Sequence, residues 1–183
     1  MQARLASKAF RPIDPEGSAD RAFGWCQPSD PLETNVDVSA CLNGDLLNLG
    51  MRIDTLRVPA ALRAAHVRKE ADRVRQVLGR TNLSRAELAE IRERVRVALR
   101  KKSLAAIKCV DVLWHVEEGT VHVFSGSASG NEFVWQLFHE TFELEIVGES
   151  AAHAAQRAQD DLGANDDWMG VIEPMADIRD VEG

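Results

Sequence analysis

Apolar and polar residues alternate with the period of a β-strand in residues 46–54. The apolar positions of this stretch are Leu47, Leu49, Met51 and Ile53, and polar residues or glycine separate them. This alternation is typical of a strand with one buried and one solvated face. Residues 36–42 precede it across Asn43-Gly44, a dipeptide favoured in hairpin turns. We therefore predict that residues 36–42 and 46–54 pair as the two strands of a hairpin.

Residues 109–116 and 120–125 indicate a second hairpin around Glu118-Gly119. Pairing across a two-residue turn would place Trp114 opposite Val123 and His115 opposite His122. The face that carries the Val and Trp side chains is expected to be the core face.

A helix and a last strand are expected to follow. Ser129 or Asn131 can cap a helix that contains Phe133, Leu137 and Phe138, and the segment LEIV at 144–147 is interpreted as a strand. Three of the tryptophans are expected in the core: Trp25, Trp114 and Trp135.

Between the two hairpins the apolar period becomes helical. Pro59 suits the start of a helix, and apolar residues then recur at heptad spacing before Gly79: Ala60, Ala64, Val67, Ala71, Val74 and Leu78. Ser84 and Glu87 form the S-x-x-E capping box of a second helix, whose apolar face contains Leu88, Ile91, Val95 and either Ala98 or Leu99. Two helices of about 20 residues with a short connection are expected to form an antiparallel hairpin roughly 30 Å long.

These elements predict an α+β fold in which an antiparallel sheet with packed helices carries a projecting basic helical hairpin. A discontinuous body is expected from residues 1–56 and 105–147, with the hairpin at 57–104. Residues 148–183 are expected to form an acidic, mobile tail, with a short helix near 151–162.

The formal net charge of −7 hides a division along the chain. Residues 1–50 have a net charge of −3, residues 51–108 of +10 and residues 109–183 of −14. The most basic stretch is RERVRVALRKK at 92–102. Asymmetry of this size indicates a basic interaction surface and a separate acidic segment.

Arginines repeat along one side of each expected helix. Arg85, Arg92, Arg96 and Arg100 fall on one side of the second helix, next to its apolar face, and Arg68 and Arg75 follow the apolar face of the first. The planar guanidinium suits phosphate, because it donates two hydrogen bonds and stays charged. The alternative is a solvated face neutralised by acidic neighbours; the regional excess of positive charge favours an anion-binding surface.

Other chemistry has weaker support in the sequence. His115 and His122 could ligate a transition metal with Asp111, although the polar outer face of a hairpin is the favoured interpretation. Residues 125–129, SGSAS, match neither the G-x-S-x-G motif nor a P-loop. The three scattered cysteines, Cys26, Cys41 and Cys109, show no zinc or disulfide spacing and are expected to be buried. We therefore expect a protein that is not an enzyme and holds no metal or cofactor.

Apolar runs in the chain fall short of the roughly 18 residues that span a bilayer. The N-terminal MQARLASKAF also lacks the apolar region of a secretion signal. A cytoplasmic protein without a membrane partner is therefore expected.

The order of several motifs resembles the recombination-associated protein RdgC family, particularly its short members. The resemblance covers residues 3–148 and is carried by AFRPIDPEGSADRAFGWCQPSDP, LLNLGMRIDTLRVPAALRAAHVRKEADRV, LSRAELAEIRERVRVALRKK, VDVLWHVEEGTVHVFSGS and a helix before LEIV. It implies a nucleoid-associated, non-enzymatic protein that binds double-stranded DNA with little sequence preference, dimerises and limits recombinase access to DNA. Family members begin with a further strand and more of the first helix, and long members have a second half; an open clamp or weaker homodimer is therefore expected instead of a closed ring.

The resemblance maps the family's projecting helical element onto residues 59–102. Its basic lining would then correspond to Arg68, Lys69, Arg75, Arg92, Arg96, Arg100, Lys101 and Lys102, to which the helical pattern adds Arg85. The alternative is a protein-interaction module that uses the helical hairpin, with the acidic tail competing for its basic face.

Overall fold

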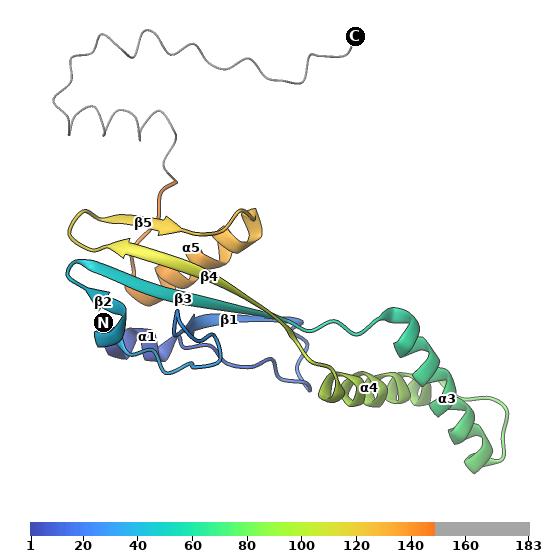
Figure 1. Cartoon of the computed structure of the whole chain (residues 1–183). Helices are drawn as coiled ribbons and strands as arrows, with labels where there is room; N and C mark the ends of the chain where they lie inside the picture. Colours follow the sequence, from blue (N-terminus) through green and yellow to red (C-terminus); the bar gives the residue numbers. More distant parts are fainter. Residues whose placement is uncertain (149–183) are drawn as a thin grey trace, which may run out of the picture. The chain divides into compact units, whose positions relative to one another are not determined.

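The computed structural model describes residues 1–148 of the chain. Met1–Ile146 forms one compact unit of the chain. The expected acidic tail beyond Gly148, including the expected helix near 151–162, lies outside the described residues. Within Met1–Ile146 an antiparallel sheet is combined with helices, which confirms the predicted α+β class (Figure 1).

In residues 1–148 the sheet has five strands: β1 (Arg21–Cys26), β2 (Leu42–Asn43), β3 (Leu46–Thr55), β4 (Ala106–His115) and β5 (Thr120–Val123). The strand order is β1-β3-β4-β5, and β2 pairs with the first residues of β3. The helices of the same part are α1 (Gln2–Ser7), α2 (Val38–Cys41), α3 (Ala60–Leu78), α4 (Arg85–Lys102) and α5 (Ala128–Phe142). Because α3 and α4 lie between β3 and β4 in sequence, the two central strands are joined through the helical pair.

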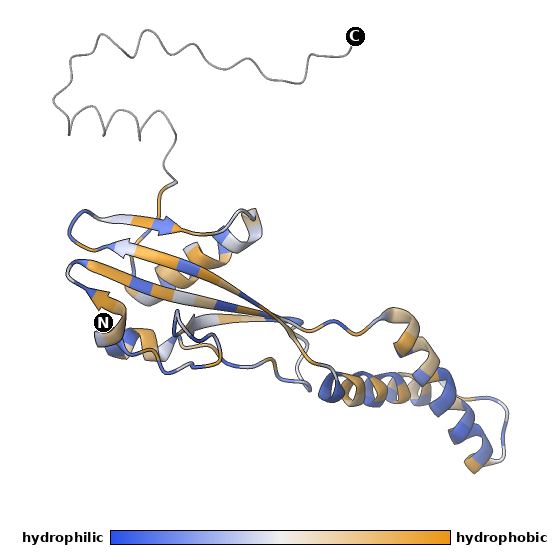
Figure 2. Ribbon diagram, viewed as in Figure 1, coloured by the Kyte–Doolittle hydropathy of each residue, from blue (hydrophilic) through white to orange (hydrophobic). Residues whose placement is uncertain are grey.

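The main core lies between the sheet and α5. Leu47, Leu49 and Met51 of β3 are fully buried, as the alternating pattern predicts. They pack in one cluster with Leu5 of α1 and with buried residues of α5: Val134, Leu137, Phe138 and Phe142. The apolar residues of β3 and β4 colour the ribbon orange in bands along the sheet in Figure 2, whereas the outer part of α3 is mostly blue.

The part of the opposite face of β3 that carries Arg52 and Asp54 is covered, although the alternation predicts that it is solvated, whereas Asn48 is exposed. The side chain of Arg52 is 12% exposed and that of Asp54 only 5%, and the two form an ion pair at 2.7 Å. The Arg52 guanidinium also lies over the Phe10 ring, at 4.2 Å from its centroid, and donates to the backbone oxygen of Pro31. Segments distant in sequence thus bury a polar face.

The prediction of a strand at 36–42 is wrong, because this segment contains α2 and only the first residue of the two-residue β2. The carboxylate of Asp37 caps α2 by accepting a hydrogen bond from the backbone nitrogen of Ser39 at 2.9 Å. The Gln2 side chain bonds the backbone of both Val36 and Val38. The turn itself is confirmed: Gly44 has a φ of +64° between β2 and β3.

The predicted register of the second hairpin is wrong by two residues. Trp114 pairs with Val121 and His115 with Thr120, because the connection between β4 and β5 contains four residues. A shift of two residues leaves every side chain on its original face. Val112 and Trp114 therefore lie in the core, as predicted.

Three expectations about the C-terminal part of the body are wrong. Residues 144–147 form no strand, because Glu143 ends α5 in a left-handed conformation at a φ of +61° and the chain continues irregularly. Trp135 is 43% exposed, since α5 buries the neighbouring Val134 and Phe138. Trp25 is fully buried, as predicted, and its Nε1 donates to Thr141 Oγ1 at 2.8 Å. The cap of α5 is Ser127, not Ser129 or Asn131.

Candidate nucleic-acid interface

We call residues 57–104 the helical arm and the rest of Met1–Ile146 the body. In Figure 1, α3 leaves the end of the sheet and α4 returns to it. The contact between the two helices is apolar and centres on four buried residues: Ala71, Ile91, Val95 and Leu99. Leu99, not Ala98, therefore continues the apolar face of α4. Ala60, Ala64 and Leu78 of the predicted seam are exposed, so α3 is packed mainly in its central part.

Local sequence signals define the ends of the arm helices. The predicted capping box is present, with Ser84 Oγ accepting from the backbone of Glu87 and the Glu87 carboxylate accepting from the backbone of Ser84. Arg80 forms an ion pair with Glu87 across the connection. Gly79 caps α3 at a φ of +61°, a conformation that favours glycine. The connection that reverses the chain is therefore specified by nearby residues.

Arg100 binds the body and is not open to solvent. The residue is 5% exposed, and its guanidinium donates to the backbone oxygens of three residues in the loop before β1: Asp14, Pro15 and Ala19. It also forms an ion pair with Asp20. This site satisfies the guanidinium with protein acceptors, so Arg100 anchors the base of α4 to the loop.

Arg96 and Lys101 are attached to the same loop. Arg96 donates to the backbone oxygens of Gly17 at 2.7 Å and Glu16 at 2.9 Å, and it pairs with Glu93. The hydrogen bond from Arg96 lowers the pKa of Glu93. Lys101 pairs with the Glu16 carboxylate at 2.7 Å, and this contact raises the pKa of Lys101. Three of the nine predicted DNA-binding residues thus hold the arm against the body.

A groove along one side of the α3–α4 contact is lined by several arginines of both helices. Its volume is about 710 Å³, and its floor includes Val67, Ala71 and Leu88. We call it the arginine groove, after the five arginines that line it: Arg63, Arg68, Arg75, Arg92 and Arg96. The side chains of Arg63, Arg68 and Arg92 have no ion pair or hydrogen bond with any residue in 1–148, whereas Arg75 pairs with Asp72.

On the other side of the arm, two arginines share one carboxylate. Glu70 on α3 pairs with Arg73 at 2.8 Å and, across the helix contact, with Arg94 at 3.3 Å. Its pKa is lowered, first by the hydrogen bond from Arg73. The alternative of acidic partners on the helix face therefore applies to Arg73 and Arg94, while the side chains of three arginines of the arginine groove have no ion pair within the described part of the chain.

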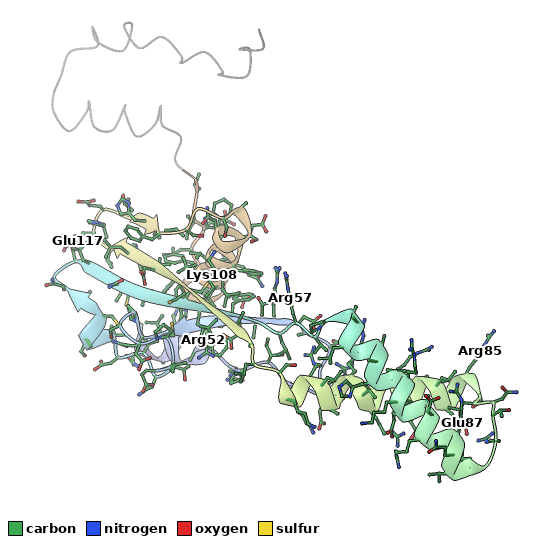
Figure 3. The ribbon with its side chains drawn as sticks, turned by 45° about the vertical axis from the view of Figure 1, so that its right-hand side comes forward. Arg52, Arg57, Arg85, Glu87, Lys108 and Glu117 are labelled. Atoms are coloured by element: carbon green, nitrogen blue, oxygen red, sulfur yellow. The ribbon has the colours of Figure 1, made fainter. Side chains whose placement is uncertain are left out.

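The remaining predicted DNA-binding residues lie outside the arginine groove. Lys69, Arg85 and Lys102 are exposed and have no ion pair within residues 1–148. Arg85 lies at the start of α4, at the far end of the arm from the sheet (Figure 3). Lys69, Arg85 and Lys102 therefore add positive charge to the surface of the arm, but they do not line the arginine groove.

Sequence reasoning missed Arg57 and Arg63. Both belong to the basic region 51–108, so the regional charge contained a signal for them. The helical pattern alone did not place them, because Arg57 precedes α3 and Arg63 lies in its first turns. Only the crossing of α4 shows that Arg63 lines the same groove as Arg92.

The histidine pair does not extend to a metal site within residues 1–148. The rings of His115 and His122 lie 5.4 Å apart between centroids, on diagonal positions of β4 and β5. Groups of three or more potential ligand residues are absent from the part of the chain that the structure describes. Cys26 and Cys109 lie near each other, with 3.9 Å between their sulfurs, and burial raises the pKa of Cys26 to about 12.

Among residues 1–148, none of the helices is both long enough and apolar enough to cross a bilayer. In comparisons with known proteins, the chain matches no family model and no curated protein.

Proposed function

We propose that this protein binds double-stranded DNA through the arm, without sequence preference and without catalysing a reaction. The observation that carries the proposal is the distribution of ion pairs. Arg63, Arg68 and Arg92 line one groove without a carboxylate partner in residues 1–148, whereas Arg73 and Arg94 on the other side share Glu70. Unpaired guanidinium groups on a rigid element suit a polyanion, because each can bind a phosphate bidentately.

Phosphate contacts, not base contacts, are expected to dominate. An apolar floor of small side chains offers few groups for reading base edges, while the arginines repeat along the arm. The groove arginines and the exposed Lys69, Arg85 and Lys102 would make about four to seven phosphate contacts. Affinity should then fall with salt at a log-log slope of about −4 to −6.

The wider role that we propose rests on the resemblance to the RdgC family. It comprises action in recombination or replication, restriction of recombinase access to DNA, association with the nucleoid and assembly into a homodimer. The uncompensated charge of the arginine groove supports the DNA contact that such a role requires.

Replacing two groove arginines should weaken DNA binding. We expect R68Q/R92Q to lower the affinity for a 30-base-pair duplex about tenfold at 0.1 M salt and to reduce the salt slope by about 2, since two phosphate contacts are lost. Fluorescence anisotropy titrations at several salt concentrations measure both quantities. Two duplexes of unrelated sequence should bind wild type equally.

The matched control is R73Q/R94Q. It also removes one arginine from each arm helix, but from the side where both pair with Glu70. We expect its affinity and salt slope to stay much closer to those of wild type. Equal losses in the two double variants would contradict a DNA site at the arginine groove, and salt-independent binding would contradict the proposal as a whole.

An apolar component of the arm favours a second candidate function, a protein-interaction module. Leu62, Val77 and Leu78 of α3 are 45%, 73% and 48% exposed, and the floor of the arginine groove is apolar. A protein partner with an apolar strip and acidic flanks would fit these features. Light scattering with and without DNA separates the two functions. The measured molar mass would increase on addition of DNA if the arm binds DNA, and on addition of the protein partner if the arm is a protein-interaction module.

The acidic C-terminal segment should oppose DNA binding. Residues 150–183 contain eight acidic and two basic residues, so they reduce the attraction of the whole chain to DNA and can compete for the arm. We expect D160N/D161N/D166N/D167N to bind duplex DNA several-fold more tightly than wild type at low salt, with the difference shrinking as salt increases. Unchanged affinity at low salt would exclude this competition.

A further inference from the structure

Two basic residues of the body, Arg21 and Lys108, lie on one face of the sheet at the end from which the arm departs, and Arg57 lies at the start of the arm beside them. Arg21 on β1 pairs with Thr55 on β3, and Lys108 on β4 pairs with Ile53 two residues away. Side chains two residues apart along a strand share a face. Arg57 follows Thr55 by two residues, just beyond the end of β3. Arg57 and Lys108 both lie near the junction of sheet and arm in Figure 3.

These three residues are exposed and lack carboxylate partners in residues 1–148. Lys108 Nζ donates to Ser127 Oγ at 3.0 Å, a neutral partner that leaves its charge uncompensated. Arg21 lies over the ring of Phe133, with 5.9 Å between the guanidinium carbon and the ring centroid. Both contacts orient the side chains without neutralising them, so a concentrated positive charge is held on a rigid part of the sheet.

The basic face of the body continues into the arginine groove. A cavity at the junction is lined by Arg57 together with Arg63 and Arg96, and the latter two residues also line the arginine groove. Arg57 therefore connects the two sets of cations. Two strand spacings of about 4.8 Å and an offset of two residues place the backbones of Arg21 and Lys108 roughly 12 Å apart across β3, so the two side chains can contact separate phosphates of one nucleic-acid backbone.

We propose that Arg21, Arg57 and Lys108 form a second phosphate-binding surface, which continues the path of the duplex from the arm onto the end of the sheet. This inference rests on the proposed function. It assigns to the body a direct DNA contact and gives the complex a longer footprint than the arm alone provides. The arm groove follows α3, about 28 Å long at 1.5 Å per residue, and the body surface extends it by roughly 10 Å or more.

The test compares R21Q/R57Q/K108Q with wild type on a 30-base-pair duplex. Glutamine retains a hydrogen-bond donor toward Ser127, so loss of charge is separated from loss of the contact. We expect affinity to fall roughly tenfold at 0.1 M salt and the salt slope to decrease by about 2 to 3. Hydroxyl-radical footprinting should show a protected region shortened at one end, with protection by the arm retained.

The matched control is K8Q/R73Q/R94Q, which removes the same charge from residues that are paired with Glu140 or Glu70. We expect it to keep the full footprint and most of the salt slope. If wild type binds DNA and R68Q/R92Q weakens binding, but R21Q/R57Q/K108Q changes neither slope nor footprint, the body surface is refuted while the arm site stands. If wild type does not bind DNA, the proposed function itself fails.

Discussion

Substitution of Gly24 by alanine is expected to destabilise the body by about 3 kcal/mol or more. Gly24 lies in β1, where the segment that ends at Phe10 passes directly against the strand: Phe10 N donates to Trp25 O at 2.8 Å, and Trp25 N donates to Lys8 O at 3.0 Å. A Cβ at Gly24 would lie 2.5 Å from the Phe10 Cα and 2.7 Å from its nitrogen. Both are backbone atoms, so the chain itself must move. Urea denaturation monitored by tryptophan fluorescence measures the loss.

Gly126 is the matched control for this substitution. A Cβ there would have no neighbour within 4 Å, so Gly126→Ala should change the free energy of unfolding by no more than about 0.5 kcal/mol. Similar midpoints for the Gly24 and Gly126 variants would show that the segment before β1 does not pack as described.

Arg100→Ala is expected to cost about 3 kcal/mol and to release the base of the arm. The substitution removes the hydrogen bonds to Asp14, Pro15 and Ala19 and leaves the Asp20 carboxylate without this partner. Thermal unfolding measures the overall loss. Hydrogen exchange should show faster exchange in the loop before β1 and in the last turn of α4, with β3 less affected.

Two further variants separate anchoring from charge. Arg92→Ala removes an exposed arginine of the same helix and should shift stability by no more than about 0.5 kcal/mol. Arg100→Lys keeps the charge but loses the planar fork, and it should recover only part of the stability. An Arg100→Ala protein as stable as Arg92→Ala would show that the loop contacts of Arg100 contribute little.

Elements with local signals could be predicted from the sequence. The alternation in β3 reflects burial against α5, and the capping box of Ser84 and Glu87 lies within one helical turn. The segment 36–42 does not form the predicted strand; its backbone is bonded by Gln2, 34 residues before Val36, a contact that the local pattern does not contain. The register of β4 and β5 is not predictable from the alternation of apolar residues, because that alternation is the same whether the connection has two residues or four.

The candidate site could be predicted only in part, for a similar reason. Arg92, Arg96 and Arg100 repeat along one side of α4 and look equivalent in the sequence. Their environments differ because a loop before β1 supplies backbone acceptors: Pro15, bonded to Arg100, lies 85 positions earlier in the chain. Periodicity identifies which side of a helix is basic, but only tertiary structure separates arginines that anchor from arginines that are available to a ligand.

The pairing of β3 with β4 also bears on how such a chain can vary. Thr55 pairs with Ala106 at the last rung, so everything from residue 56 to residue 105 leaves and re-enters the sheet at adjacent positions. In topological terms the arm is the loop of a β-hairpin, and the entropy of closing a loop rises only slowly with its length. Insertions or deletions of whole helical turns in α3 and α4 would therefore change the reach of the arm while the strand register stays the same. The reach of the arm, and with it the length of DNA that we propose the arm contacts, can thus vary independently of the architecture of the sheet.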